Sequence, residues 1–126
     1  MSTVKPRVRF APAPTGMMHL GNIRTALMNA LFAKKHDGTF VLRIEDTDAQ
    51  RNYDPKAHQI IADLAWLGLT HDEGPSSDKS MAGKPQTHEP HPPYFQSQRA
   101  PIYQAKLDEL IANKSVYRCF CTEEAL

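Results

Sequence analysis

The stretch RVRFAPAPTGMMHLG, from Arg7 to Gly21, constrains the fold of this chain more than any other feature. Its apolar first residues, followed by turn formers, predict a short strand over Arg7–Ala11. Two prolines and a glycine between residues 12 and 16 then exclude both a helix and a strand ladder. The chain must therefore leave the sheet through an extended loop, Pro12–Gly21. Apolar residues next recur at helical spacing, which predicts a helix over Asn22–Lys35.

The junction between this loop and the helix is a candidate anion site. Free backbone amides and the helix dipole both favour a negative charge at the start of a helix. Asn22 is a favoured residue type for a helix N-cap, and Gly21 lets a ligand approach the backbone closely. His19 lies in the loop as a potential hydrogen-bond donor. The expected ligand is a phosphate.

A second strand is predicted over Thr39–Ile44, which is rich in β-branched and aromatic residues. We expect Gly38 to end the preceding helix with a positive φ. A strand, a helix and a strand of these lengths predict a right-handed βαβ unit with a parallel pair, and hence the α/β class. Ligands of open parallel sheets bind beyond the carboxyl ends of the strands. The loops Pro12–Gly21 and Glu45–Asp48 both start there, so they should meet at one crevice.

A helix is predicted from Asp54, an N-cap type followed by proline, to about Leu67. Gly68 is expected to end it. We expect Trp66 to lie in the core, because aromatic burial dominates small cores.

The C-terminal third predicts one more amphipathic helix, over Ser97–Asn113. After an extended piece, Val116–Phe120, Thr122 is expected to cap a further helix. The buried side of the Ser97–Asn113 helix should consist of Ile102, Leu107, Leu110 and Ile111.

The motif PxPTGxxHLGN after a strand resembles the HIGH signature of class I aminoacyl-tRNA synthetases. A longer set of blocks is similar to glutamyl-tRNA synthetases in particular and covers nearly the whole chain. The blocks are RFAPAPTG at 9–16, LRIEDTD at 42–48, WLG at 66–68, DEGP at 72–75, YFQSQR at 94–99 and YRCFC at 117–121. The resemblance implies the N-terminal part of a Rossmann-type, parallel-sheet nucleotide-binding domain, truncated relative to the several times longer family members.

The resemblance also implies an ATP site. His19 corresponds to the first histidine of the signature and would donate to the phosphates during catalysis. Gly21 would let the adenosine lie against the backbone, and Asn22 replaces the final histidine of the signature. Thr15 and Gly16 would line the same pocket.

The glutamate site implied by the resemblance contains Arg9, Ala11, Ala13 and Glu45. Arg9 would bind a substrate carboxylate as a bidentate fork, and Glu45 would bind the ammonium group. Ala13 departs from the family, which usually has serine there, and the loss removes one hydrogen bond worth about 1 kcal/mol. Asp46 and Asp48 are interpreted as loop-structuring residues rather than acid–base groups. Arg43 is expected to form an ion pair.

Cys119 and Cys121 match the first half of the zinc site of some glutamyl-tRNA synthetases and of the enzyme that glutamylates queuosine in a tRNA. A structural zinc needs about four ligands, and no histidine follows Cys121. The half-site is therefore incomplete here, and two free thiols are the alternative.

Residues 76–93 predict an inserted, irregular loop. Five of the ten prolines lie between Pro75 and Pro93, and aliphatic residues are almost absent there. Lys79-Ser80-Met81 resembles part of a KMSKS motif but lies in the wrong place, so we interpret it as coincidental. His88 and His91 are expected to be solvated rather than to bind a metal.

Charge is unevenly distributed along a chain whose net charge is only +1. The first 36 residues carry six basic and no acidic side chains, whereas the remainder carries nine basic and fourteen acidic ones. A basic patch beside the predicted phosphate site suits a polyanionic ligand, although Lys34 and Lys35 are also favoured simply by ending a helix. No apolar run is long enough for a membrane span or a signal peptide, so a cytoplasmic chain without a membrane partner is expected.

The resemblance implies a glutamate–tRNA ligase that uses ATP with Mg²⁺, L-glutamate and tRNA(Glu), with zinc as an option in the full-length, monomeric enzyme. The 126-residue chain should be an inactive N-terminal piece, because the KMSKS lysine and the tRNA-reading domains lie beyond it. Two alternatives stay open: the tRNA-modifying glutamyl-queuosine synthetase, and a non-catalytic fragment that binds a nucleotide or a partner protein. The LRIEDTD block favours the glutamyl over the glutaminyl branch.

Overall fold

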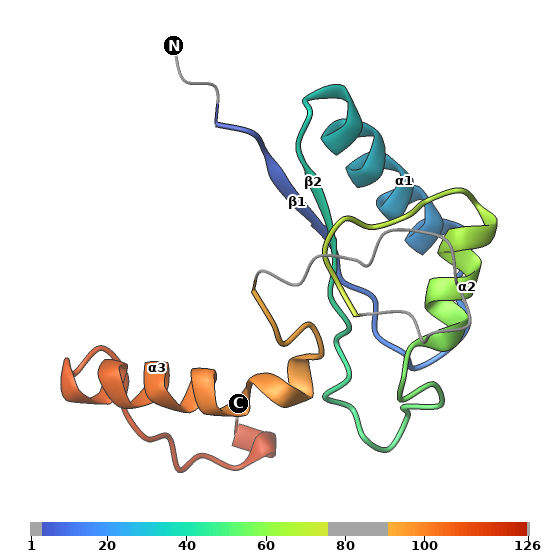
Figure 1. Cartoon of the computed structure of the whole chain (residues 1–126). Coiled ribbons are helices and arrows are strands. Elements are labelled where there is room, and N and C mark those ends of the chain that lie inside the picture. The colour runs from blue at the N-terminus through green and yellow to red at the C-terminus, as the bar shows by residue number, and fades with distance from the viewer. Residues whose placement is uncertain (1–3, 76–90, 126) are drawn as a thin grey trace.

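The computed structural model describes residues 4–75 and 91–125. The elements in chain order are β1 (Arg7–Phe10), α1 (Leu20–Lys35), β2 (Thr39–Leu42), α2 (His58–Trp66), the 3-10 helix η1 (Gln96–Arg99), α3 (Ala100–Ala112) and the 3-10 helix η2 (Glu123–Ala125) (Figure 1). The predicted α/β class is confirmed.

Strands β1 and β2 form a parallel pair, with Arg7 opposite Thr39 and Phe10 opposite Leu42. Helix α1 connects them and packs on both, as a parallel crossover requires (Figure 1). Two later segments add isolated parallel bridges, from Glu73 to Val41 and from Phe95 to Ile44. The carboxyl ends of β1 and β2 therefore point to the same edge, where the predicted site should lie.

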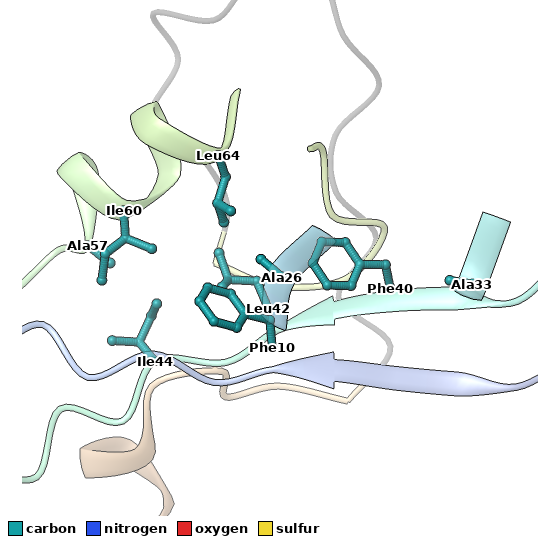
Figure 2. Packing of buried hydrophobic residues seen from close by; sticks show 9 residues of the cluster. All are labelled: Phe10, Ala26, Ala33, Phe40, Leu42, Ile44, Ala57, Ile60 and Leu64. Atoms are coloured by element: carbon teal, nitrogen blue, oxygen red, sulfur yellow. The ribbon is translucent and has the colours of Figure 1, made fainter. Parts of the chain in front are cut away.

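The core lies between the strands and helices α1 and α2. Helix α1 contributes two alanines, whose small side chains let it approach the sheet, and α2 contributes Ile60 and Leu64. Figure 2 shows these side chains facing those of the strands. Every member of the cluster is at most 3% exposed: Phe10, Ala26, Ala33, Phe40, Leu42, Ile44, Ala57, Ile60 and Leu64. Burial of this set is the main source of stability for so small a unit.

The end of α1 differs from the prediction. Asp37, not Gly38, adopts the left-handed conformation, with φ of 51°. Gly38 has a different role, because a Cβ at this position would lie 2.3 Å from the carbonyl oxygen of Pro6. The glycine is needed for a close approach of two backbones at the start of β2.

Helix α2 begins at His58, later than predicted, and Trp66 is not in the core. Asp54 accepts hydrogen bonds from the backbone N–H groups of His58 and Gln59, at 3.0 and 2.8 Å, and so caps the helix from outside. Trp66 is 85% exposed, which makes its predicted burial wrong. Trp66 follows the buried Leu64 by two positions, which turns it about 200° around the helix, away from the core. Gly68 does end the helix, with φ of 72°.

The predicted buried side of α3 is also wrong. Ile102, Leu107, Leu110 and Ile111 are 43–48% exposed, and α3 has no buried residue. Among the described elements α3 packs mainly on η1, and Figure 1 shows it lying away from the strands, α1 and α2. The sequence pattern was amphipathic, but nothing within the described ranges covers the apolar side.

The remaining C-terminal and loop predictions have mixed outcomes. Val116–Phe120 has no regular hydrogen bonding, and the helix expected after Thr122 is only the 3-10 turn η2. Most of the predicted inserted loop, Lys79–Met81 and His88 lie outside the described residues, whereas His91 is exposed. None of the helices in the described part is long and apolar enough to span a bilayer.

Candidate nucleotide and amino-acid site

A cavity of about 260 Å³ lies at the loop that connects β1 to α1. It contains four of the five residues predicted to bind ATP, and Gly21, the fifth, lies in the adjoining first turn of α1. Its lining consists of Pro12, Ala13, Thr15, Gly16, Met17, Met18, His19 and Asn22. The volume is below the range of about 300–1,000 Å³ common for small-molecule sites, as expected of one part of a larger pocket.

His19, rather than Asn22, is the N-cap of α1. Its Nδ1 accepts a hydrogen bond from the backbone N–H of Gly21 at 3.1 Å. Asn22 is the third helical residue, and its Oδ1 accepts from the backbone N–H of His19 at 3.2 Å. The two side chains form a reciprocal capping box, so the helix starts two residues earlier than predicted. The H-x-x-N spacing was the signal for this cap.

Gly21 makes room for the imidazole. A Cβ at Gly21 would lie 2.9 Å from Cε1 of His19, closer than real Cβ contacts, and 3.0 Å from Nδ1. Any side chain at position 21 would therefore displace the ring from the helix start. The expected reason for this glycine was the approach of a ligand, and the position of His19 adds a second, intramolecular reason.

The two predicted loops are joined directly by backbone hydrogen bonds. Glu45 donates its N–H to the carbonyl oxygen of Pro12 at 2.9 Å, and Tyr53 donates to that of Pro14 at 3.2 Å. Arg43 donates to Phe10 in the same way at 3.0 Å. The prediction that the loops meet beyond the strand ends is confirmed, because parallel neighbours carry them to one edge.

The residues predicted to bind glutamate are distributed around this junction. Arg9 lies on β1 with an exposed side chain, and Ala11 lies half-buried at its carboxyl end. Ala13 lines the cavity at the helix start. The structure thus brings Ala13 together with the predicted ATP residues, whereas Arg9, Ala11 and Glu45 lie outside the cavity lining.

Glu45 already has a cationic neighbour. Its Oε1 accepts a hydrogen bond from Nη2 of Arg43 at 2.5 Å, which confirms the ion pair expected of Arg43. Both side chains are only partly exposed, at 22% for Arg43 and 38% for Glu45. The ion pair fixes one of the two Glu45 oxygens, and no described residue hydrogen-bonds the other, which leaves it for a further donor.

Asp48 structures its own loop, as predicted, whereas Asp46 binds a distant segment. Asp46 accepts from the backbone N–H of Ser97 at 2.8 Å and from its Oγ at 2.6 Å. Asp48 accepts from the backbone and side chain of Arg51, and the hydrogen bond from Arg51 holds the pKa of Asp48 below its ordinary value. The role of Ser97 was not foreseen, because nothing in the local sequence connects it with residue 46.

A larger cavity, of about 550 Å³, shares no lining residue with the smaller one, and both Asp46 and Ser97 line it. Prolines form much of its wall, with Tyr94 and Phe95, and the side chains of Lys56 and His58 in its lining are exposed. We take the smaller cavity as the site, because it combines a helix N-terminus with a capping histidine and adjoins the Glu45 loop.

Cys119 and Cys121 are exposed free thiols. A hydrogen bond from the backbone N–H of Cys121 lowers the pKa of the Cys119 thiol. Across residues 4–75 and 91–125, no group of three or more His, Cys, Asp and Glu side chains is arranged to hold a metal ion. The two thiols alone do not fit the four-ligand geometry of structural zinc.

Comparison with known proteins matches residues 5–126 to the family of class I tRNA synthetases (E and Q), catalytic domain. A glutamate–tRNA ligase of Anaeromyxobacter sp. (strain K) is 50% identical over 122 residues, which are 97% of this chain and 24% of that protein. One from Elusimicrobium minutum (strain Pei191) is 50% identical over 125 residues, 98% of this chain and 24% of that protein.

Solved structures agree with these relatives. A glutamate tRNA ligase from Elizabethkingia meningosepticum CCUG26117, in complex with its amino acid, superposes with a TM-score of 0.74 and 41% identity, covering 97% of this chain and 22% of that one. The glutamate–tRNA synthetase from Elizabethkingia anophelis superposes with a TM-score of 0.72 and 44% identity. The match covers 86% of this chain and 20% of that one.

The chain therefore belongs to the class I tRNA synthetase (E and Q) catalytic-domain family, and the resemblance seen in its motifs is confirmed. It spans about a quarter of the length of the curated relatives that it matches.

Proposed function

We propose that this protein is part of a glutamate–tRNA ligase. The enzyme would join the carboxylate of L-glutamate to the α-phosphate of ATP, releasing pyrophosphate, and then pass the glutamyl group to the 3′ end of tRNA(Glu). The observation that carries the proposal is the meeting of the Pro12–Gly21 loop, at the start of α1, with Glu45. The names of the relatives support the same assignment.

On the ATP side, the start of α1 would receive the phosphates. Nδ1 of His19 accepts from Gly21, so the proton of the neutral ring lies on Nε2. Nε2–H is then free to donate to a phosphate oxygen as negative charge develops. Thr15, Gly16 and Asn22 would line the nucleotide, and Mg²⁺ would neutralise the phosphates.

On the glutamate side, Arg9 would bind a carboxylate as a bidentate fork, and the free oxygen of Glu45 would accept from the ammonium group. Ala11 and Ala13 would contact the substrate from the loop. Since the reacting groups are both anions, catalysis would consist mainly of positioning and charge neutralisation, and no protein nucleophile is required.

The longer enzyme would supply the rest of the reaction. The 126-residue chain alone should not aminoacylate tRNA, because it lacks the KMSKS lysine. The full-length enzyme is proposed to be monomeric and to act in the cytoplasm, where its tRNA is used. A zinc ion would need ligands in addition to Cys119 and Cys121.

The test is calorimetric titration of the chain with a non-hydrolysable glutamyl-adenylate analogue, for the wild type and His19→Ala. Binding by the wild type that weakens about tenfold or more in the variant supports the proposal, since charge-assisted phosphate contacts are worth about 1.5–3 kcal/mol. Failure of a folded wild-type chain to bind the analogue contradicts a half-site formed by residues 9–45.

A further inference from the structure

Asp46 and Ser97 link the Glu45 loop to the start of the last long helix. They lie 51 positions apart, yet both oxygens of the Asp46 carboxylate accept hydrogen bonds from Ser97, from its N–H at 2.8 Å and its Oγ at 2.6 Å. Two hydrogen bonds from one residue to one carboxylate fix its orientation as well as its distance, and the ionised acceptor strengthens both.

This contact supplies a cap that η1 lacks. The residue at its N-cap position, Phe95, offers no side-chain hydrogen bond, so the free N–H of Ser97 in the first turn depends on Asp46. The same two segments pair through their backbones. Ile44 donates to Tyr94 and Gln96 donates to Ile44, each at 2.8 Å.

Glu45 lies between these two anchors. Ile44 is fully buried on one side of it, and Asp46 is held on the other. Ile44 is held by its backbone pairing with Tyr94 and Gln96, and Asp46 is held by Ser97. Both neighbours of Glu45 are therefore fixed against the segment 94–97, which restricts the direction in which the Glu45 side chain leaves the chain. The hydrogen bond from the N–H of Glu45 to the carbonyl oxygen of Pro12, at 2.9 Å, also fixes Glu45 against the Pro12–Gly21 loop.

We propose that Asp46 and Ser97 are positioning residues that hold Glu45 in the orientation needed to bind the ammonium group of the amino-acid substrate. They touch neither substrate and act only through the backbone of the Glu45 loop. This inference rests on the proposed function, because it assigns Glu45 to the amino acid and the start of α1 to ATP.

The test compares the affinity for a glutamyl-adenylate analogue with the affinity for AMP, which lacks the glutamyl group. Ser97→Ala keeps the N–H contact with Asp46 and loses the Oγ contact. It should therefore lower the affinity for the analogue about 3- to 10-fold and leave the affinity for AMP unchanged. Ser97→Thr, which keeps the hydroxyl, should restore binding to within about twofold of the wild type. Asp46→Asn should weaken the analogue further than Ser97→Ala.

Asp54→Asn is the matched control. Asp54 also caps a helix with two hydrogen bonds, on α2, and among the described residues its carboxylate bonds only to that helix. It should change stability without changing the ratio of the two affinities. If Ser97→Ala lowers the affinities for the analogue and for AMP equally, or lowers neither, the positioning role is overturned.

A failure of the proposed function can be recognised separately. If the folded wild type binds neither ligand, the proposed function fails. The Glu45 amide resonance then decides the inference. If this NMR resonance shifts in Ser97→Ala and Asp46→Asn but not in Asp54→Asn, the result supports the proposal that Asp46 and Ser97 position Glu45. A resonance that does not shift in the first two variants overturns the proposal.

Discussion

Arg7 and Glu73 form a two-pronged ion pair across 66 positions of sequence. Nε of Arg7 donates to Oε1 of Glu73 at 3.0 Å, and Nη2 donates to Oε2. Glu73 is only 7% exposed and also accepts from the hydroxyl of Tyr94 at 3.1 Å. The cluster links β1 to the two chain segments that form bridges beside β2, at positions 73 and 95, and so holds these segments against the sheet.

Glu73→Gln should lower the free energy of unfolding by about 1–3 kcal/mol, because it removes a charge-assisted pair at a buried acceptor. The measurement is denaturant unfolding followed by circular dichroism. Glu109→Gln is the matched control, since the Lys106–Glu109 pair is exposed on α3 and should contribute less than about 1 kcal/mol. Equal effects of the two substitutions would contradict the importance of burial.

The same carboxylate predicts a pH dependence. Hydrogen bonding from Arg7, helped by that from Tyr94, holds the pKa of Glu73 below its ordinary value of 4.5. A depressed pKa in the folded state stabilises the protein above the unfolded value, and this stabilisation is lost as pH falls through the folded value.

The difference in unfolding free energy between wild type and Glu73→Gln should therefore be full above pH 4.5 and shrink at lower pH. Urea titrations at several pH values measure it. A gap that stayed constant down to the acid transition would contradict the assigned cause.

Leu64 and Trp66 provide a paired test of the core. Leu64→Ala should cost about 2–4 kcal/mol, because Leu64 is 1% exposed and its removal leaves a cavity. Trp66→Ala should change stability by less than about 0.5 kcal/mol, because its side chain is 85% exposed. The measurement is the thermal unfolding of both variants, compared with that of the wild type. A larger loss for Trp66→Ala would mean that the tryptophan is covered in solution.

Gly38→Ala should destabilise the chain by about 1–3 kcal/mol, because the new Cβ would overlap the carbonyl oxygen of Pro6. Gly16 is a suitable control, since a Cβ there would meet no heavy atom within 4 Å. Chemical denaturation should show a lower midpoint for the first variant alone. Similar midpoints for the two would indicate that the backbones separate at little cost.

The two roles of His19 can be separated by a pair of variants. His19→Ala removes the cap of α1 and should lower stability by about 0.5–2 kcal/mol, whereas His19→Asn retains a side-chain acceptor and should recover most of that loss. Both should bind the glutamyl-adenylate analogue more weakly, because neither has the imidazole Nε2–H. Wild-type binding by His19→Asn would show that the imidazole serves only the helix.

Local signals predicted much of the fold. Helical spacing, the proline–glycine loop and a β-rich run identified β1, α1 and β2, and the parallel pair followed from their lengths. The errors came where a choice depended on neighbours. Trp66 was expected inside because of its size, but the register of Leu64 turns it outward. The buried side predicted for α3 is wrong, because an apolar pattern does not state what covers it.

The site divides in the same way. Motif order identified the residues of the helix start and of the Glu45 loop, and parallel topology predicted that these loops meet. Its residue type favours Asn22 as the N-cap, whereas the absence of a side chain at Gly21 lets His19 take that position.

By itself, the sequence determined the α/β class, the two loops and the family of this protein, because each follows from short motifs whose own residues are close together in the chain. Only the tertiary structure decided the pairs Arg7–Glu73 and Asp46–Ser97, and through the latter the surroundings of Glu45. Contacts across more than fifty residues have no local sequence signature. They arise when folding brings separate segments to one edge of a sheet, where buried charges and free helix amides must find partners.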